Sequence, residues 1–244
     1  MSSKSKEYIE RAKQLKDLDK LEEAIKMCEA AITLDAANSE AWYWKAWCLE
    51  ESGKNEESMK AVEGAIRIDP RNADAWNHKG FIFKNLERYI EALEAFEEAT
   101  RIDPRNADAW SNKGNTLHTL DRHEKALEAY DEAIRIDPRH ANAWNNKGSV
   151  LYILDRYEES MKAVEEAIRI DPRHALAWLN KGNVFYNLKK YEKALEAYDE
   201  ALRINPRYAR AWHHKSIIFE KLGRKKESKD AYKKAEEIVY SRQI

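Results

Sequence analysis

Residues 73–106 read ADAWNHKGFIFKNLERYIEALEAFEEATRIDPRN. Apolar side chains recur in them at spacings of three and four, which predicts amphipathic helix. The spacing breaks at the polar pair Glu87–Arg88 and then resumes in a shifted phase. Pro104 cannot continue a helix, because its ring removes a hydrogen-bond donor and clashes with the preceding turn. The stretch therefore predicts two helices joined by a short turn, the second ending before Pro104.

The tryptophans extend this pattern along the chain. Counting back 34 residues from Trp42 reaches Tyr8, an aromatic residue in the same place. A constant period of this length predicts a tandem array of helical hairpins, and we expect one domain over residues 1–244. Six of the eight tryptophans fall at a spacing of 34 residues: Trp42, Trp76, Trp110, Trp144, Trp178 and Trp212. The predicted repeats are residues 5–38, 39–72, 73–106, 107–140, 141–174, 175–208 and 209–242.

The recurring Trp, the Gly four residues later, the Ala-x3-aromatic-x2-Ala run and the closing Pro resemble the tetratricopeptide repeat. The resemblance implies an all-α solenoid, a right-handed superhelix of seven helix-turn-helix repeats. Some positions depart from the family pattern. Ala12, Ala46 and Ser216 replace the Gly, and Ala36 replaces the first Pro. Lysine occupies a usually apolar place, where its stem can cover apolar surface, at Lys45, Lys79, Lys113, Lys147, Lys181 and Lys215.

Both ends of the array carry polar residues at places that are otherwise apolar or small. Glu7 stands where six later repeats have Ala, and Lys229 and Glu236 in the seventh repeat replace apolar residues of the earlier ones. The outermost faces of a solenoid have no neighbour to cover them and need polar residues. We therefore expect seven repeats to form a complete, capped array.

The resemblance also implies that ligands lie on the inner face made by the first helix of each repeat. Asn112, Asn146 and Asn180 share the sixth place, and resemble the asparagine ladder in the repeats of O-GlcNAc transferase, which grips the backbone of an extended peptide. An amide supplies both a donor and an acceptor for a peptide backbone. Asn115 and Asn183, at the ninth place, could add to this ladder. The alternative is that these asparagines only solvate the groove or bond neighbouring helices.

A group of aromatic residues is additional to the tryptophan series. Large rings on an open face suit a binding hot spot, because they bury much area at little entropic cost. The alternative is that Trp44 or Trp47 fills space against the first repeat. The candidate peptide-binding residues beside the asparagines are Tyr43, Trp44, Trp47 and Phe81, with Tyr152 and Tyr186 at the twelfth place and His78 and His214 at the sixth.

A chaperone-binding subclass of the family uses a clamp of three cations and two asparagines for the acidic ends of heat-shock chaperones. The best frame here places Ser111, Asn115, Asn146, Leu176 and Asn180 at the five clamp positions. Both asparagines match and all three cations are missing. The sequence therefore argues against a chaperone tail as the partner.

Charge and composition exclude several classes of protein. The net charge is -1, and no apolar run approaches the roughly 20 residues that span a bilayer. The start, MSSKSKEYIE, has no apolar segment typical of a secretory signal, so we expect a cytoplasmic protein. The seventh repeat is strongly basic, with Lys225, Lys226, Lys229 and Lys233, which leaves an acidic partner or nucleic acid as an alternative ligand, although no groove-reading motif accompanies the charge.

No chemistry-bearing motif is found, so we expect no enzyme activity, metal or cofactor. His213 and His214 are adjacent and so diverge on a helix, and Cys28 and Cys48 fall among apolar helix positions. The predicted function is a protein-interaction scaffold that binds an extended peptide, as a monomer or a weakly associating chain. Self-association, end to end or through residues 238–240, is an alternative. Near-identical stretches such as ESMKAVEGAIRIDPR and ESMKAVEEAIRIDPR fit recent duplication or consensus-style engineering, and an engineered chain need have no natural partner.

Overall fold

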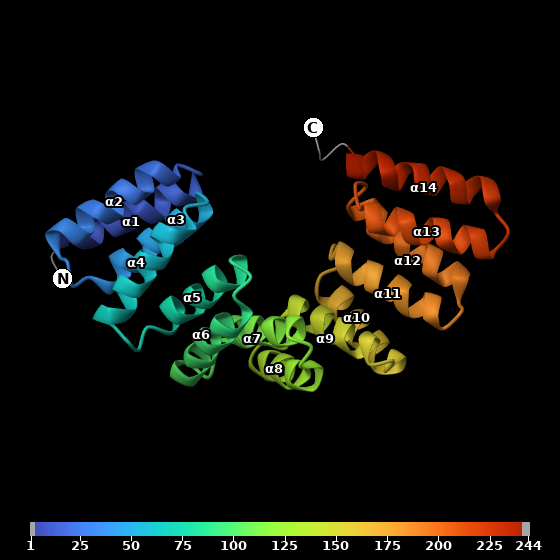
Figure 1. Cartoon of the computed structure of the whole chain (residues 1–244), viewed down its shortest axis with the longest axis horizontal. Helices are drawn as coiled ribbons and strands as arrows, with labels where there is room; N and C mark the ends of the chain where they lie inside the picture. The colour runs from blue at the N-terminus through green and yellow to red at the C-terminus, as the bar shows by residue number, and fades with distance from the viewer. Residues whose placement is uncertain (1–2, 241–244) are drawn as a thin grey trace. The chain divides into compact units, whose positions relative to one another are not determined.

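The computed structural model describes residues 3–240 (Figure 1). Within this range the chain forms fourteen α-helices in seven consecutive pairs and no strand, which confirms the predicted all-α class and the helix-turn-helix repeat. Ser241 and Arg242, the last residues of the predicted seventh repeat, lie outside the described residues. The helices are α1 Ser3–Asp17, α2 Leu21–Leu34, α3 Ser39–Glu51, α4 Asn55–Ile68, α5 Ala73–Asn85, α6 Tyr89–Ile102, α7 Ala107–Thr119, α8 His123–Ile136, α9 Ala141–Ile153, α10 Tyr157–Ile170, α11 Ala175–Asn187, α12 Tyr191–Ile204, α13 Ala209–Lys221 and α14 Lys225–Tyr240.

Packing groups the chain into two compact units, one up to residue 122 and one from residue 123. In the first unit α2 packs on α3, α4 on α5, and α6 on α7. In the second, α8 packs on α9, α10 on α11, and α12 on α13. Each second helix thus contacts the first helix of the following repeat, and the one-domain organisation over residues 1–244 stays a prediction.

The turn inside each repeat has a left-handed residue. After α5, Glu87 has φ 58°, its N–H donates to the Lys84 carbonyl at 3.0 Å, and the Arg88 N–H donates to the Phe83 carbonyl at 2.9 Å. These two bonds make a Schellman motif, which satisfies carbonyls at the helix end. The predicted break at Glu87–Arg88 is confirmed. The equivalent left-handed residues are Asp19, Gly53, Asp121, Asp155, Lys189 and Gly223.

The connection between repeats is set by the Asp-Pro-Arg sequence. α6 ends two residues before Pro104, as predicted, and the Asp103 side chain accepts a hydrogen bond from the Arg105 N–H at 3.0 Å. The Asn106 side chain then caps α7 by accepting from the Ala109 N–H at 2.9 Å. A cap of this kind pairs one of the donors that a helix start leaves free.

The lysines that depart from the family pattern connect neighbouring repeats. Lys79 lies with its ammonium 5.5 Å from the centre of the Trp76 ring and 3.3 Å from Glu63 on the preceding second helix. The Trp76 indole in turn donates to the Pro70 carbonyl at 3.1 Å. The same lysine–carboxylate pairing recurs as Lys45–Glu29, Lys113–Glu97, Lys147–Asp131, Lys181–Glu165 and Lys215–Asp199.

Residue size explains the departure at Ala46. A Cβ built on Gly182 lies 2.4 Å from the Tyr198 ring, so this place has no room for a methyl group. In the second repeat Ala46 occupies the same place, and the residue in the position of Tyr198 is the smaller Val62. The smaller Val62 leaves room for the Ala46 methyl group, but a small facing residue does not require Ala, because Gly148 faces Val164. Among residues 3–240, no helix is both long enough and apolar enough to span a membrane.

Candidate functional site

The first helices of successive repeats lie beside one another within each unit. α1 contacts α3, α3 contacts α5, and α5 contacts α7, while α9 contacts α11 in the second unit. Side chains at one repeat place therefore form a row along each unit, and the fifth, sixth, ninth and twelfth places supply the predicted binding residues.

Two of the three sixth-place asparagines donate hydrogen bonds to asparagines of the preceding repeat. Asn112 donates from Nδ2 to Asn77 Oδ1 at 3.1 Å, and Asn180 donates in the same way to Asn145 Oδ1 at 2.9 Å. Asn145 is buried and donates to Asn146 Oδ1 at 3.0 Å. These bonds fit the interpretation that the asparagines connect neighbouring helices. The fifth-place partners Asn77 and Asn145 were not predicted.

The bonds use only part of each amide. No described residue donates to the Oδ1 of Asn112 or Asn180, and both side chains are half-buried. Each Nδ2 is held by the neighbouring repeat, so each Oδ1 remains an acceptor. At the ninth place the acceptor of Asn183 is already occupied, because the Tyr198 hydroxyl donates to it at 2.8 Å. Asn115 at the same place is half-buried.

The tryptophans near the start of the chain differ in their surroundings. Trp44 packs against Ile9 and Ala31 of the first repeat, which fits the space-filling interpretation. Trp47 is half-buried, its ring centre lies 6.2 Å from that of Trp44, and the Lys16 ammonium lies 4.4 Å from its ring.

Trp47 also lines a cavity of about 250 Å³ between α3 and α5. His78 in its wall is buried, and burial lowers the pKa of its imidazole to about 4. Burial likewise raises the pKa of Tyr43 to about 12. The structure thus brings predicted residues together with Glu50, Glu51 and Asn77, which were not predicted, although their places belong to the inner-face set. The lining residues are Tyr43, Trp47, Glu50, Glu51, Asn77, His78 and Phe81.

The predicted aromatic residues of the second unit pack within it. Tyr152 lies edge-on to Tyr157, with ring centres 5.7 Å apart, and its hydroxyl accepts a hydrogen bond from Asn187. Tyr186 lies 5.9 Å from the Tyr191 ring. The sixth-place histidine, His214, is half-buried and stacks on the buried Tyr198 ring at 5.5 Å, and burial lowers its pKa.

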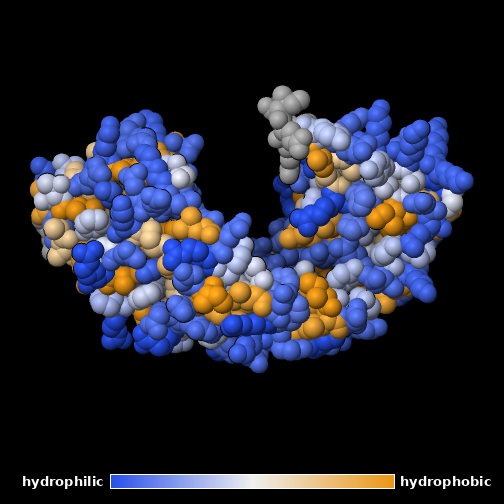
Figure 2. Space-filling model, viewed as in Figure 1, coloured by the Kyte–Doolittle hydropathy of each residue, from blue (hydrophilic) through white to orange (hydrophobic). Residues whose placement is uncertain are grey.

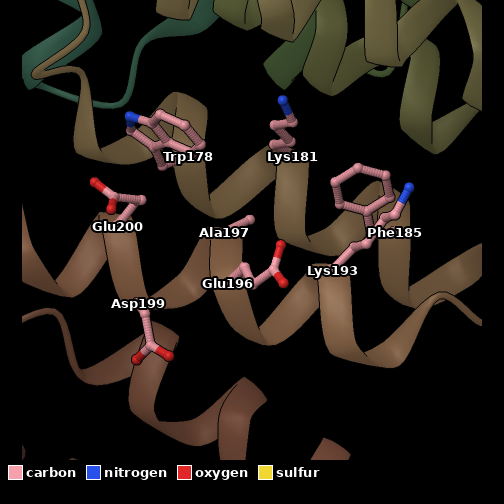
Figure 3. Close-up of a pocket in the computed structure, with 8 residues that line it drawn as sticks. All are labelled: Trp178, Lys181, Phe185, Lys193, Glu196, Ala197, Asp199 and Glu200. Atoms are coloured by element: carbon pink, nitrogen blue, oxygen red, sulfur yellow. The ribbon is translucent and has the colours of Figure 1, made fainter.

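A second kind of cavity lies between the two helices of a single repeat. In the sixth repeat it measures about 590 Å³, and Figure 3 shows Trp178, Lys181 and Phe185 of α11 above Ala197 of α12. Asp199 points away from these rings and pairs with Lys215 of the next repeat. The third repeat holds a smaller cavity of about 270 Å³ at the same repeat places. This cavity was not predicted.

The remaining candidates are on the surface or in the core. Cys28 and Cys48 are buried free thiols, as their positions predicted. Across the described range, no group of three or more His, Cys, Asp or Glu is placed to hold a metal ion. The surface is hydrophilic with separate hydrophobic patches (Figure 2). The lysines proposed for an acidic ligand, Lys225, Lys226, Lys229 and Lys233, are exposed on α14.

The chain is an α-solenoid, because its helices pair and the pairs pack in series. Polar and aromatic side chains are aligned on the first helices, and solenoids of this kind are scaffolds for protein interactions. Family models described as tetratricopeptide repeat match residues 15–79, 73–106, 107–140, 141–174, 175–208 and 209–238. The chain belongs to the tetratricopeptide repeat family, whose fold is typically a non-catalytic scaffold. No curated protein matches the sequence of this chain.

Solved structures of the same fold resemble it over most of its length. A tetratricopeptide repeat protein from Parabacteroides merdae aligns with a TM-score of 0.75 at 17% identity, over 97% of this chain and 94% of its own. YrrB, described as having an unusual peptide-binding site, aligns with a TM-score of 0.62 at 26% identity, over 77% and 97%. MamA aligns with a TM-score of 0.59 at 24% identity, over 67% and 96%.

Proposed function

We propose that the chain binds an extended peptide segment of a partner protein along the first helices of its repeats. The observation that carries this proposal is the common geometry of Asn112 and Asn180. In both, Nδ2 is tied to the preceding repeat and Oδ1 accepts nothing from the described chain. Each acceptor is held in the same way within its own unit, and each suits a backbone N–H group of an extended peptide.

The peptide-binding site of YrrB supports the same function, because YrrB is similar to this chain over three quarters of its length. Asn146, at the same repeat place, belongs to the proposed set, although its Oδ1 already accepts one hydrogen bond from Asn145. Trp47 and Phe81 supply half-buried rings at the ninth place for apolar contact, and Tyr43 lies beside them. In this arrangement the asparagines fix the peptide backbone, whereas the rings provide affinity. The cytoplasmic location stays a prediction.

The test is a selection from a displayed library of random dodecapeptides against the full chain. We expect the triple variant Asn112→Ala, Asn146→Ala and Asn180→Ala to bind the selected peptides at least about tenfold more weakly, since the lost Oδ1 acceptors of Asn112 and Asn180 each remove a hydrogen bond of roughly 1 kcal/mol. The control is Glu128→Ala, Lys162→Ala and Glu196→Ala, at one exposed place of the second helices.

Peptides that bind the asparagine triple variant as tightly as the original chain would show that the ladder does not hold the peptide. Selected peptides that bind only at low salt, and lose binding when the α14 lysines are neutralised, would instead favour the basic seventh repeat as the binding surface.

A further inference from the structure

The cavity between α3 and α5 has the side chains that bind organic cations. Three aromatic residues, Tyr43, Trp47 and Phe81, line it together with the carboxylates Glu50 and Glu51. Aromatic rings attract cations over their faces, and sites for alkylated ammonium groups are built from several such rings. Two carboxylates beside the rings attract a cation by a charge–charge interaction, which adds to the weaker attraction between the cation and the rings.

The two carboxylates are not compensated by the chain. Within the described residues, neither Glu50 nor Glu51 forms an ion pair, although Asn85 donates to Glu50 Oε1 at 2.9 Å and so fixes its position. Burial raises the pKa of Glu50, and the neighbouring Glu51 raises it further. A bound cation would offset the desolvation of Glu50 and the repulsion between Glu50 and Glu51.

His78 contributes an unused acceptor to the same wall. Its side chain is 6% exposed, and its Nε2 has no hydrogen-bond partner in the described chain. The imidazole also hydrogen-bonds the backbone of Ala46, which leaves Nε2 as the nitrogen with the lone pair. An acceptor that is buried without a donor costs free energy, so a ligand that brings N–H donors is favoured here.

The chain's own lysines show that these rings attract ammonium groups. The Lys16 ammonium lies 4.4 Å from the Trp47 ring, and the Lys84 ammonium lies 4.7 Å from the Phe81 ring. Neither lysine pairs with Glu50 or Glu51. Within the described residues, the internal cations therefore lie over ring faces and form no ion pair with the two carboxylates.

We propose that this cavity receives the ammonium group of a lysine side chain from the bound peptide. A volume of about 250 Å³ is below the range of whole small-molecule sites and suits a single side chain. The cavity is lined by residues at the fifth, sixth, ninth, twelfth and thirteenth places of two first helices. This inference therefore rests on the proposed function, in which the rest of the peptide binds along the first helices. Specificity for a basic residue would then be set by residues of the first unit other than the proposed peptide-binding asparagine Asn112.

The test uses Nα-acetyl-lysine N-methylamide as the probe, with the uncharged norleucine analogue as its matched control. Both are titrated into the 15N-labelled full chain, and the indole N–H signals of Trp47 and of Trp178 in the second unit are followed. We expect a saturable shift of Trp47 with the lysine compound only. The double variant Glu50→Gln and Glu51→Gln should weaken binding at least about tenfold, because each carboxylate contributes a charge-assisted interaction.

Glutamine keeps an oxygen for Asn85, so the double variant preserves that hydrogen bond. Glu56→Gln with Glu57→Gln is the control, since it neutralises an adjacent, exposed pair of acids on α4. Equal shifts with the norleucine compound, no saturable shift with the lysine compound, or unchanged binding in the Glu50 and Glu51 variant would overturn the proposal. The readout residue Trp47 and the substituted residues Glu50 and Glu51 are not part of the asparagine set, so this result is distinguishable from that of the peptide selection.

Discussion

At the scale of single residues, backbone conformation at the turns limits stability. Lys189 has φ 57°, and its N–H donates to the Tyr186 carbonyl at 2.9 Å. A residue with a Cβ pays about 1 kcal/mol for this left-handed conformation, and Gly does not. Only two of the seven equivalent positions carry Gly, at Gly53 and Gly223. The sequence indicated the turn at Glu87–Arg88 but not its left-handed residue, because Glu and Lys are not residues that favour this conformation.

The first prediction concerns this turn. Lys189→Gly should raise the free energy of unfolding by up to about 1 kcal/mol, because the native hydrogen bonds remain while the strain is lost. The measurement is the urea midpoint followed by circular dichroism. Lys190→Gly is the control: φ is already negative there, so Gly only adds unfolded-state entropy and should destabilise. A lower midpoint for Lys189→Gly would contradict the account.

The second prediction concerns pH. Folding holds His78 neutral down to about pH 4, whereas the unfolded chain protonates it near its ordinary pKa of 6.5. Protons therefore favour the unfolded chain, and a contribution of roughly 3 kcal/mol, fully present above pH 6.5, is lost as the pH falls to about 4.

The variant His78→Asn, with the residue found at the same place in three later repeats, should lose this part of the pH dependence. Unfolding free energies measured between pH 7.5 and about 4 by urea titration check it. The exposed His213→Asn is the control and should keep the dependence of the original chain. Parallel pH curves for the original chain and His78→Asn would show that His78 does not carry the effect.

At the scale of helices, the hairpin was predictable where strong local signals exist. Pro104 and the polar Glu87–Arg88 pair marked helix ends to within two residues, because both act through the local backbone. The need for Gly at residue 182 was visible in the sequence only as part of the repeat pattern, without its cause. Its cause is a contact between helices, since a Cβ at residue 182 would lie 2.4 Å from the Tyr198 ring.

The third prediction follows from this contact. Gly182→Ala should lower stability by about 1–3 kcal/mol, the usual cost of overpacking a core. Gly148→Ala should cost less, because the nearest side-chain atom, Val164 Cγ2, lies 3.2 Å from the built Cβ. In a Tyr198→Val background the Gly182→Ala change should become nearly neutral. Chemical denaturation of the original chain, Gly182→Ala, Tyr198→Val and the double variant measures this coupling. Additive effects would rule out the contact as the cause.

At the scale of the whole molecule, the repeat period predicted the family and the rows of side chains, and it left the site incomplete. The inner-face positions were assigned by place in the repeat, and this located Trp47, Phe81 and Asn180 correctly on first helices. It did not identify Glu50 and Glu51 as uncompensated charges, because that depends on which side chains the neighbouring repeats supply. It also missed Asn77 and Asn145, whose role is to orient the sixth-place amides.

The most direct test of peptide binding is to observe the asparagine side chains while a library-selected peptide binds to the full chain. The side-chain amide signals of Asn112, Asn146 and Asn180, assigned from single Asn→Gln variants in 15N-labelled protein, should shift and saturate with the same midpoint as peptide binding. Asn55, which belongs to the second helix α4 and not to the first-helix row, should not move. Binding that leaves all three signals in place would contradict the account.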